Sequence, residues 1–341
     1  MELIPGRIDL GSGFVHSEKL TNPMFLGIEI GGTKLQLGVG AGDGSDFVAF
    51  ERRDVLISRG GAGIREQIRD VGRDLVAAYK VQRVGYGFGG PVLGARGIVQ
   101  TSHQVAGWDQ FPLVEWTQQE LGIPTTLGND CDVACLAEAC FGAGRGAQSV
   151  FYVTVGTGIG GGLVFDQKIH GTTRPAAAEI GHLRPGLDAI KYSNTVESRA
   201  AGPGIAHATQ ATLRRLSESG QTSPALNDLL SRCGGQIDTL TTKSIGEAAL
   251  AGNELAREEY KAAMQVLGWA IAQVITVVAP EVVVVGGGVS LVGEDLFFAP
   301  LRAAVDQYVF PPLAKAFQLH PAALGESVVV HGALALARLS H

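Results

Sequence analysis

The first strongly apolar stretch of the chain is residues 25–30, FLGIEI, and this short run predicts a strand. A tight turn follows at Gly31-Gly32-Thr33-Lys34, and the apolar residues at 35–39 predict a second strand. The order is therefore strand, turn, strand. A P-loop or a dinucleotide-binding motif would place its glycine-rich loop at the start of a helix, so this segment favours neither of them.

The same pattern returns in the second part of the chain. Residues 150–155 predict a strand, Gly156-Thr157-Gly158-Ile159-Gly160 forms the turn, and residues 161–165 predict the next strand. VFYVTVGTGIGGGLVF thus echoes LGIEIGGTKLQLGVG. Two glycine-rich turns could arise by chance, but the similar strands around both favour an internal duplication. We therefore expect two α/β halves, each of which opens with a hairpin.

The pattern of apolar and polar residues predicts further strands and helices in both halves. Between the hairpins it predicts strands at 47–57, 84–88, 98–101 and 124–127, and helices at 64–79, 113–121 and 132–141. Beyond them it predicts a mostly helical stretch at 202–279, a strand at 282–285, and helices at 296–308 and 327–339. The run 262–279 is long enough to span a membrane, but Gln265 and Gln273 interrupt it, which favours a buried core helix.

The length of 341 residues suggests two domains, each able to bury its own core. We expect an N-terminal arm at 1–23, a first domain at 24–127 that the C-terminal helix 327–341 joins, and a larger second domain at 128–326. The arm is polar and lacks the apolar segment of a secretory signal. It is either a loose arm or the product of a start codon upstream of the real one.

Charge and cysteine content narrow the classes of protein. The net charge of −6 disfavours a nucleic-acid or anionic-membrane surface, although a local pocket can still bind a small anion. The four cysteines form no CxxC pair, so they suggest neither a zinc site nor a disulfide framework. Reduced thiols in a cytosolic protein are the expected state.

Asn129 and Asp130 stand where a predicted strand ends and a predicted helix begins. Ligands of α/β proteins bind at such strand ends. Phosphoryl transfer depends mostly on positioning and charge stabilisation, and a carboxylate here could take the proton of an attacking hydroxyl. The structural alternative is that Asp130 or Asp132 only caps the helix.

The two glycine-rich turns suggest which kind of ligand binds beside Asp130. Their backbone N–H groups can approach an anion closely, so a facing pair could hold a polyphosphate between the halves. Glu29, just before the first turn, could hold Mg²⁺ through water, although it could also be a half-buried strand acid. The side chains of Glu179, His182 and Glu197 are suited to hydrogen bonds with vicinal hydroxyls, but alone they are weak evidence.

Seven motifs, taken in order, resemble those of the ROK sugar kinases, the bacterial-type hexokinases of the actin/Hsp70/hexokinase fold. They extend from residue 24 to about residue 338 and read GIEIGGTKLQLGVG, GFGGPV, GNDCDVACLAEACFGAG, VTVGTGIGGGLVFD, AAAEIGHL, VESRAAGPGI and APEVVVVGGGVS. The resemblance implies a duplicated actin-like (ribonuclease H-like) ATPase fold of two domains around a cleft. It also implies a glucokinase-like transferase that phosphorylates a hexose or N-acetylhexosamine with ATP and Mg²⁺, as a cytoplasmic homodimer.

The resemblance also implies roles for individual residues. Asp130 would be the general base, and Glu29 would hold Mg²⁺ through water. The residues implied in nucleotide binding are Gly31, Gly32, Thr33, Lys34, Gly156, Thr157, Gly158, Gly286, Gly287 and Gly288. The residues implied in sugar binding are Gly90, Gln104, Asn129, Asp130, Glu179, His182 and Glu197.

Three departures from the family pattern refine these expectations. Glu29 stands where the family usually has Asp, so its extra methylene could shift the metal. The stretch LRPGLDAIKYSNTV lacks the cysteines of a zinc motif that many members carry, so we predict no zinc site. SHQVAGW replaces PNLPGW, which puts Gln104 in the place of an Asn and predicts an atypical sugar pocket. We expect no DNA-binding domain at the front, unlike in the repressors of the family.

Two other functions stay open at this point. The first is a non-catalytic sugar or nucleotide sensor, which Glu29 and the altered sugar segment suggest. The second is a sugar kinase that uses another phosphate donor, such as polyphosphate. Fold alone does not decide among these functions.

Overall fold

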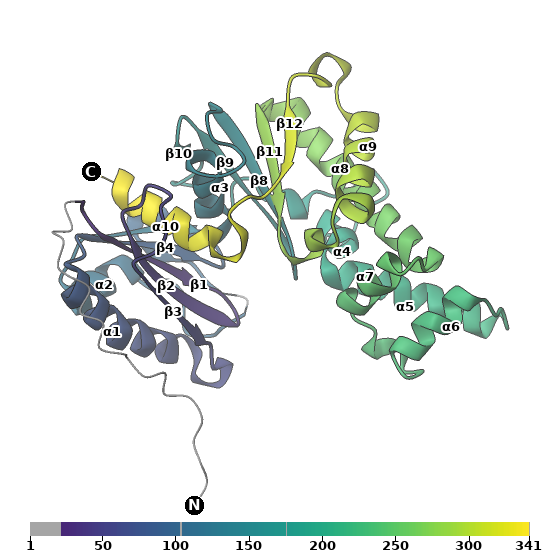
Figure 1. Cartoon of the computed structure of the whole chain (residues 1–341), viewed down its shortest axis with the longest axis horizontal. Coiled ribbons are helices and arrows are strands. Elements are labelled where there is room, and N and C mark those ends of the chain that lie inside the picture. Colours follow the sequence, from purple (N-terminus) through teal and green to yellow (C-terminus); the bar gives the residue numbers. More distant parts are fainter. Residues whose placement is uncertain (1–21, 103, 175, 341) are drawn as a thin grey trace, which may run out of the picture.

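The computed structural model describes residues 22–102, 104–174 and 176–340. Apart from Asn22 and Pro23, the predicted N-terminal arm lies outside these residues. Within them, two five-stranded sheets stand side by side, with strand orders β3-β2-β1-β4-β7 and β10-β9-β8-β11-β12 (Figure 1). A small hairpin of β5 (Val92–Leu93) and β6 (Ile98–Val99) adds a two-stranded sheet.

The first sheet opens with the hairpin that the sequence predicted. Its central strand pairs antiparallel with the second strand and parallel with the fourth. The strands are β1 (Phe25–Ile30), β2 (Lys34–Gly40), β3 (Ala49–Asp54), β4 (Arg83–Phe88) and β7 (Thr125–Asn129). Residues Leu26, Ile28 and Ile30 alternate onto one face, where they form a core with the helices α1 (Gly60–Tyr79) and α2 (Leu113–Leu121).

The second sheet repeats the first in strand order and direction. Its central strand again pairs antiparallel with the following strand and parallel with the fourth. The strands are β8 (Ser149–Val155), β9 (Ile159–Phe165), β10 (Lys168–Ile169), β11 (Val282–Gly286) and β12 (Gln318–Pro321). The internal duplication predicted from the two hairpins is therefore confirmed. The predicted domain boundaries stay predictions.

Helices fill most of the second half. They are α4 (Val196–Ala200), α5 (Gly202–Glu218), α6 (Pro224–Arg232), α7 (Thr242–Leu250), α8 (Glu254–Val278) and α9 (Ala299–Tyr308). Of the described helices, α8 alone is long and apolar enough to cross a membrane by length and composition. Its side chains Leu267, Ile271 and Ile275 belong to the core around β8 and β11, which confirms the predicted core helix.

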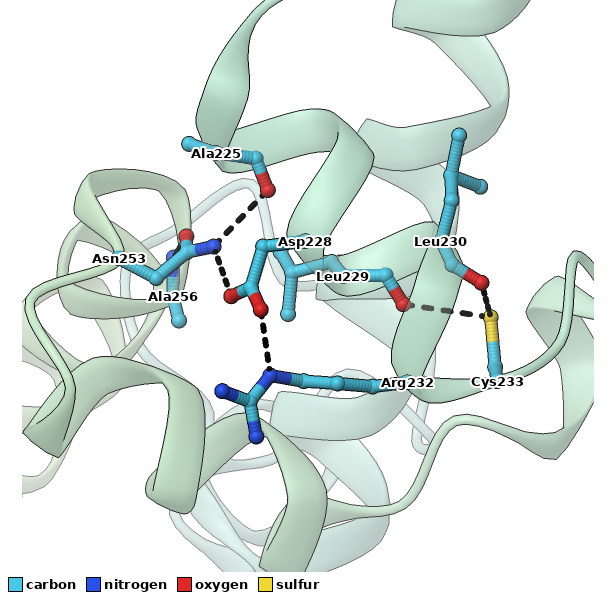
Figure 2. Close-up of polar contacts among 8 residues, drawn as sticks. All are labelled: Ala225, Asp228, Leu229, Leu230, Arg232, Cys233, Asn253 and Ala256. Atoms are coloured by element: carbon cyan, nitrogen blue, oxygen red, sulfur yellow. Dashed lines mark hydrogen bonds and ion pairs between the residues drawn. The ribbon is translucent and has the colours of Figure 1, made fainter.

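One asparagine joins α6 to the start of α8 (Figure 2). The Asn253 amide nitrogen donates to the Ala225 carbonyl and to Asp228 Oδ2, both at 2.8 Å. Its Oδ1 caps α8 by accepting from the Ala256 N–H at 3.1 Å, and Asp228 Oδ1 in turn accepts from Arg232 Nε at 3.0 Å. The outer helices are thus bound to the core helix by a satisfied polar network.

Two helices, α3 (Asp130–Cys140) and α10 (Val328–Leu339), cross between the halves, and we call them the exchanged helices. Helix α3 follows β7 of the first sheet but packs on β8 and β9 of the second. Helix α10 follows β12 of the second sheet but packs on β1 and β4 of the first, as Figure 1 shows. The two helices also pack against each other.

A row of glycines lets α10 lie directly on the first sheet. Gly85, Gly27 and Gly38 are paired neighbours on β4, β1 and β2. A Cβ atom on Gly27 would stand 2.6 Å from the Val330 carbonyl oxygen, and one on Gly85 would overlap the Ala333 carbonyl. Because these obstacles are backbone atoms, larger residues would force the helix away from the sheet.

Several elements differ from the sequence-based expectations. Helix α1 begins at Gly60, earlier than predicted, although glycine is a poor helix former. Tertiary contacts account for this, because the Gly61 N–H donates to the Ala106 carbonyl at 2.8 Å, and a Cβ atom on Gly61 would stand only 3.0 Å from Trp108 Cε2. Strand β3 is shorter than predicted, and β12, which ends in Pro321, was not predicted.

Candidate active site

Strand β7 ends at Asn129 and α3 begins at Asp130, at the junction between the sheets. The Asn129 side chain caps the helix: its Oδ1 accepts from the N–H groups of Cys131 at 2.8 Å and Asp132 at 3.3 Å. Its Nδ2 donates to the Gly90 carbonyl at 3.0 Å. The N-cap is therefore Asn129, and the alternative that Asp130 or Asp132 fills this position is wrong.

The two carboxylate oxygens of Asp130 have different surroundings. Its Oδ1 accepts from the Cys131 N–H at 2.9 Å, and its Oδ2 lies beside Gly89 of the β4 loop. Burial raises the pKa of the carboxyl to about 6, and the negative charge of Glu179 adds to this, while the Cys131 hydrogen bond opposes it. The carboxylate is thus charged at neutral pH and is a better proton acceptor than an exposed aspartate.

A cleft of about 460 Å³ opens beside Asp130, between the two sheets. It brings together six of the residues predicted for catalysis, metal and nucleotide binding: Glu29, Lys34, Asp130, Gly286, Gly287 and Gly288. Thr154 and Ser290, two polar residues that sequence reasoning missed, also line it. A Cβ atom on Gly288 would meet no other atom within 4 Å, so the loop has open space beside Gly288.

Glu29 lies at the end of the cleft that the first sheet forms, and is 8% exposed. Its Oε1 is 4.0 Å from Lys34 Nζ, and its Oε2 is buried without a hydrogen-bond partner among the described residues. Burial raises the pKa of this carboxyl to about 7 against the opposing effect of Lys34. Glu29 lines the cleft, and a carboxylate in this position fits one side of a hydrated Mg²⁺ ion.

The metal would take most of its ligands from elsewhere. Over the part of the chain that the structure describes, no three His, Cys, Asp or Glu side chains gather to hold an ion. Mg²⁺ commonly binds through one or two carboxylates together with water and substrate phosphates. The residues present therefore fit a hydrated ion that Glu29 holds from one side.

The two glycine-rich turns differ in how open they are. In the first, the Gly31 N–H donates to the Lys34 carbonyl at 3.0 Å, and the exposed Gln104 side chain lies directly against Gly32. In the second, a Cβ atom on Gly156 would meet no atom within 4 Å. The threonines of both turns, Thr33 and Thr157, are exposed. The second turn therefore leaves more room for an anion than the first, where Gln104 lies against Gly32.

Glu197 is bound to the second turn. Its Oε2 accepts from the Ile159 N–H at 2.8 Å, which fixes the carboxylate behind Gly158. Burial raises the pKa of the nearby Glu179 carboxyl. His182 opposes this shift, and the negative charge of Glu197 adds to it. Glu179 is thus within electrostatic range of both Glu197 and His182, and His182 is exposed to solvent. Their binding of sugar hydroxyls stays a prediction.

A second, smaller cavity of about 40 Å³ adjoins this group. Asn129, Asp132, Arg174 and Glu179 contribute polar side chains to its lining. Asp132 Oδ1 is buried and has no hydrogen-bond partner among the described residues, and burial raises the Asp132 pKa to about 7 with help from Asp130 and Glu179. Sequence reasoning considered Asp132 only as a helix cap, although its position two residues after Asp130 was a signal.

The chain matches the ROK family over residues 25–339. It is 28% identical to a glucokinase of Thermotoga maritima over 91% of this chain and 96% of that protein. It is 30% identical to a glucokinase of Halalkalibacterium halodurans over 92% of this chain and 94% of that protein.

The fold agrees with these matches. The crystal structure of a ROK family glucokinase from Streptomyces griseus in complex with glucose and AMPPNP superposes with a TM-score of 0.75 at 28% identity. The superposition covers 92% of this chain and 99% of the Streptomyces chain. The expected actin-like ATPase fold is thereby confirmed, and the chain belongs to the ROK family.

Proposed function

We propose that this protein transfers a phosphoryl group from ATP to a hydroxyl of a hexose or N-acetylhexosamine, with Asp130 as the general base. The observation that carries the proposal is one cleft, which Asp130, Glu29 and the loop Gly286–Gly288 line together. The glucokinase relatives, one of which binds glucose and AMPPNP, support a glucose-like substrate. We further propose that the enzyme is a cytoplasmic homodimer.

The nucleotide half of the site consists mainly of backbone. The N–H groups of Gly31 and Gly156 already donate within their turns, so the other N–H groups of the two turns would bind the phosphates. The loop Gly286–Gly288 would contact the adenosine. Glu29 would hold Mg²⁺ through water. Bound Mg-ATP supplies the phosphoryl group, and its metal neutralises the charge that develops during transfer.

The sugar half of the site consists of side chains. Glu179, His182 and Glu197 would bind the sugar hydroxyls, with Gly90, Gln104 and Asn129 completing the pocket. The Asn129 amide is already bound to Gly90 and to the start of α3, so its main effect is to hold Asp130 in place. Asp130 would orient the attacking hydroxyl and take its proton, and closure of the two halves would exclude water.

The activity should depend on pH through Asp130. Because its pKa is raised to about 6, kcat/KM should fall below that pH, where a protonated carboxyl no longer accepts a proton. The loss should be at least about tenfold per pH unit, since Glu29, the proposed metal ligand, also gains a proton as the pH falls through about 7. Initial rates from pH 4.5 to 8.5 measure this. A flat profile between pH 8 and pH 5 would contradict the assignment of Asp130.

The direct test is ADP release with Mg-ATP over a panel of hexoses and N-acetylhexosamines. We expect ADP release that depends on at least one of these sugars. Sugar binding without any product, even with Mn²⁺, would favour the sensor. Turnover with polyphosphate but not with ATP would show that the donor is wrong while the kinase activity is right.

A further inference from the structure

Four residues form one row across the first sheet: Gly87, Glu29, Gln36 and Arg52, on β4, β1, β2 and β3. Directly paired residues on neighbouring strands project from the same face of a sheet. Gly87 has no side chain, and a Cβ atom there would be 2.7 Å from Val133 Cγ2. The start of α3 therefore lies over one end of the row, and Glu29 and Gln36 come next along it.

Glu29 and Gln36 each have a buried side-chain oxygen that lacks a hydrogen-bond partner among the described residues. Gln36 is 2% exposed, and its Oε1 has no hydrogen-bond partner among the described residues; the same is true of Glu29 Oε2. A buried polar atom without a partner costs stability. The Cβ atoms of such directly paired residues are about 4.5–5.5 Å apart, so the two ends can meet. Both atoms are acceptors, so neither can satisfy the other in this orientation of the amide.

Rotation of the amide resolves this defect. The nitrogen and oxygen of a glutamine amide exchange places by a half-turn about the last side-chain bond. Because Glu29 and Gln36 are directly paired, that turn would allow the amide N–H to face Glu29 and to supply its carboxylate with a donor. Lys34 does not replace this donor, since 4.0 Å is too long for a hydrogen bond. Arg52 lies one strand further away and pairs instead with Glu326 at 3.6 Å.

We propose that Gln36 is a positioning residue for Glu29: its amide Nε2–H donates to Glu29 Oε2 and fixes the carboxylate toward the cleft. A glutamate has one more rotatable bond than the aspartate usual in the family, so its carboxylate needs a further restraint. One hydrogen bond leaves the remaining lone pairs of the carboxylate for water around a metal ion. The inference rests on the proposed role of Glu29.

The first test is Gln36→Leu, which keeps a similar volume and removes the amide. Partners that orient a metal ligand typically contribute 10- to 100-fold in metal affinity, so Mn²⁺ affinity should fall at least about tenfold. Electron paramagnetic resonance with Mn²⁺ and a non-hydrolysable ATP analogue measures this without turnover. Sugar affinity, measured by calorimetry, should not change.

The matched control is Gln210→Leu in the second half. It also removes a buried amide, whose Nε2 donates to the Leu240 carbonyl at 3.0 Å. It should lower the free energy of unfolding and leave Mn²⁺ affinity unchanged. If Gln36→Leu does not fold, Gln36→Asn takes its place, because it keeps the amide but withdraws it by one methylene.

A double-mutant cycle with Glu29→Asp identifies the partner. The shorter aspartate does not reach Gln36, so Gln36→Leu should cost little further Mn²⁺ affinity in that background. An equal loss in both backgrounds, or wild-type Mn²⁺ affinity in folded Gln36→Leu, overturns the inference alone. A wild-type protein that binds no Mn²⁺ with the nucleotide overturns both the inference and the proposed metal role of Glu29.

Discussion

Asp130→Asn should lose nearly all sugar-dependent ADP release and keep sugar binding. Asparagine has almost the same shape, and its side-chain oxygen can still accept the Cys131 N–H, but it does not take a proton from a hydroxyl. General-base catalysis typically contributes about 10²- to 10⁴-fold, so kcat should fall within or beyond that range. A coupled ADP assay measures kcat, and calorimetry measures sugar affinity.

A measurement of stability distinguishes loss of the general base from misfolding of the Asp130→Asn variant. The folded-state pKa of Asp130, about 6, lies above the ordinary value of an aspartate, so the folded protein binds this proton more tightly than the unfolded chain does. The stability that protonation provides is complete below about pH 4 and is lost as the pH rises through about 6. At pH 8, Asp130→Asn should therefore unfold at a higher urea concentration than the wild type.

Asp132→Asn is the matched control for position on α3. Asp132 does not line the large cleft, so this variant should keep most of its kcat. Near wild-type turnover of Asp130→Asn, or a complete loss in Asp132→Asn alone, would show that the base has been assigned to the wrong carboxyl.

Gly332→Ala should be among the most destabilising single substitutions in this protein. A Cβ atom at this position of α10 would overlap the Val133 carbonyl of α3. The obstacle is backbone, so no side-chain rotation relieves it and the exchanged helices must separate. Overpacking typically costs about 1–3 kcal/mol, and we expect the upper end of that range or more. Urea unfolding followed by circular dichroism measures the loss.

Gly72→Ala in α1 is the control, since it makes the same change within a helix. A Cβ atom there would lie 3.2 Å from Leu121 Cδ1, the end of a flexible side chain. Alanine gains about 1 kcal/mol over glycine in helix propensity, so this variant should be as stable as the wild type or more stable. Equal gains from both substitutions would contradict the close packing of α3 on α10.

Sequence periodicity was sufficient for the duplication because each half opens with the same short-range pattern. β1 and β8 are apolar runs that end in a glycine-rich turn, and such a pattern is local. The packing partners of α3 and α10 are not local. From the sequence alone, the glycines at 27, 38 and 85 only weaken three separate strands. The strand register shows that they lie in one row under α10.

The candidate site divides in the same way. Asp130 and Glu29 were identified from motifs, and the structure brings them to one cleft, although their roles stay proposals. The capping role of Asn129 needed coordinates, because three polar residues within four positions, Asn129, Asp130 and Asp132, could each have filled the N-cap position. Gln36 carried no signal at all, since its relation to Glu29 depends on which residues pair across two strands.

The exchanged helices set the order in which this protein can be completed during synthesis. The face of the first sheet that carries Gly27 and Gly85 is covered by α10, which is made last. About 200 residues separate the end of β7 from the start of α10. At ribosomal rates of about 5–20 residues per second, this face therefore stays uncovered for roughly 10–40 seconds. We therefore expect the nascent chain to need chaperones over that interval, and the candidate cleft to be complete only when α10, which contributes Val328 and Val329 to its lining, has been made.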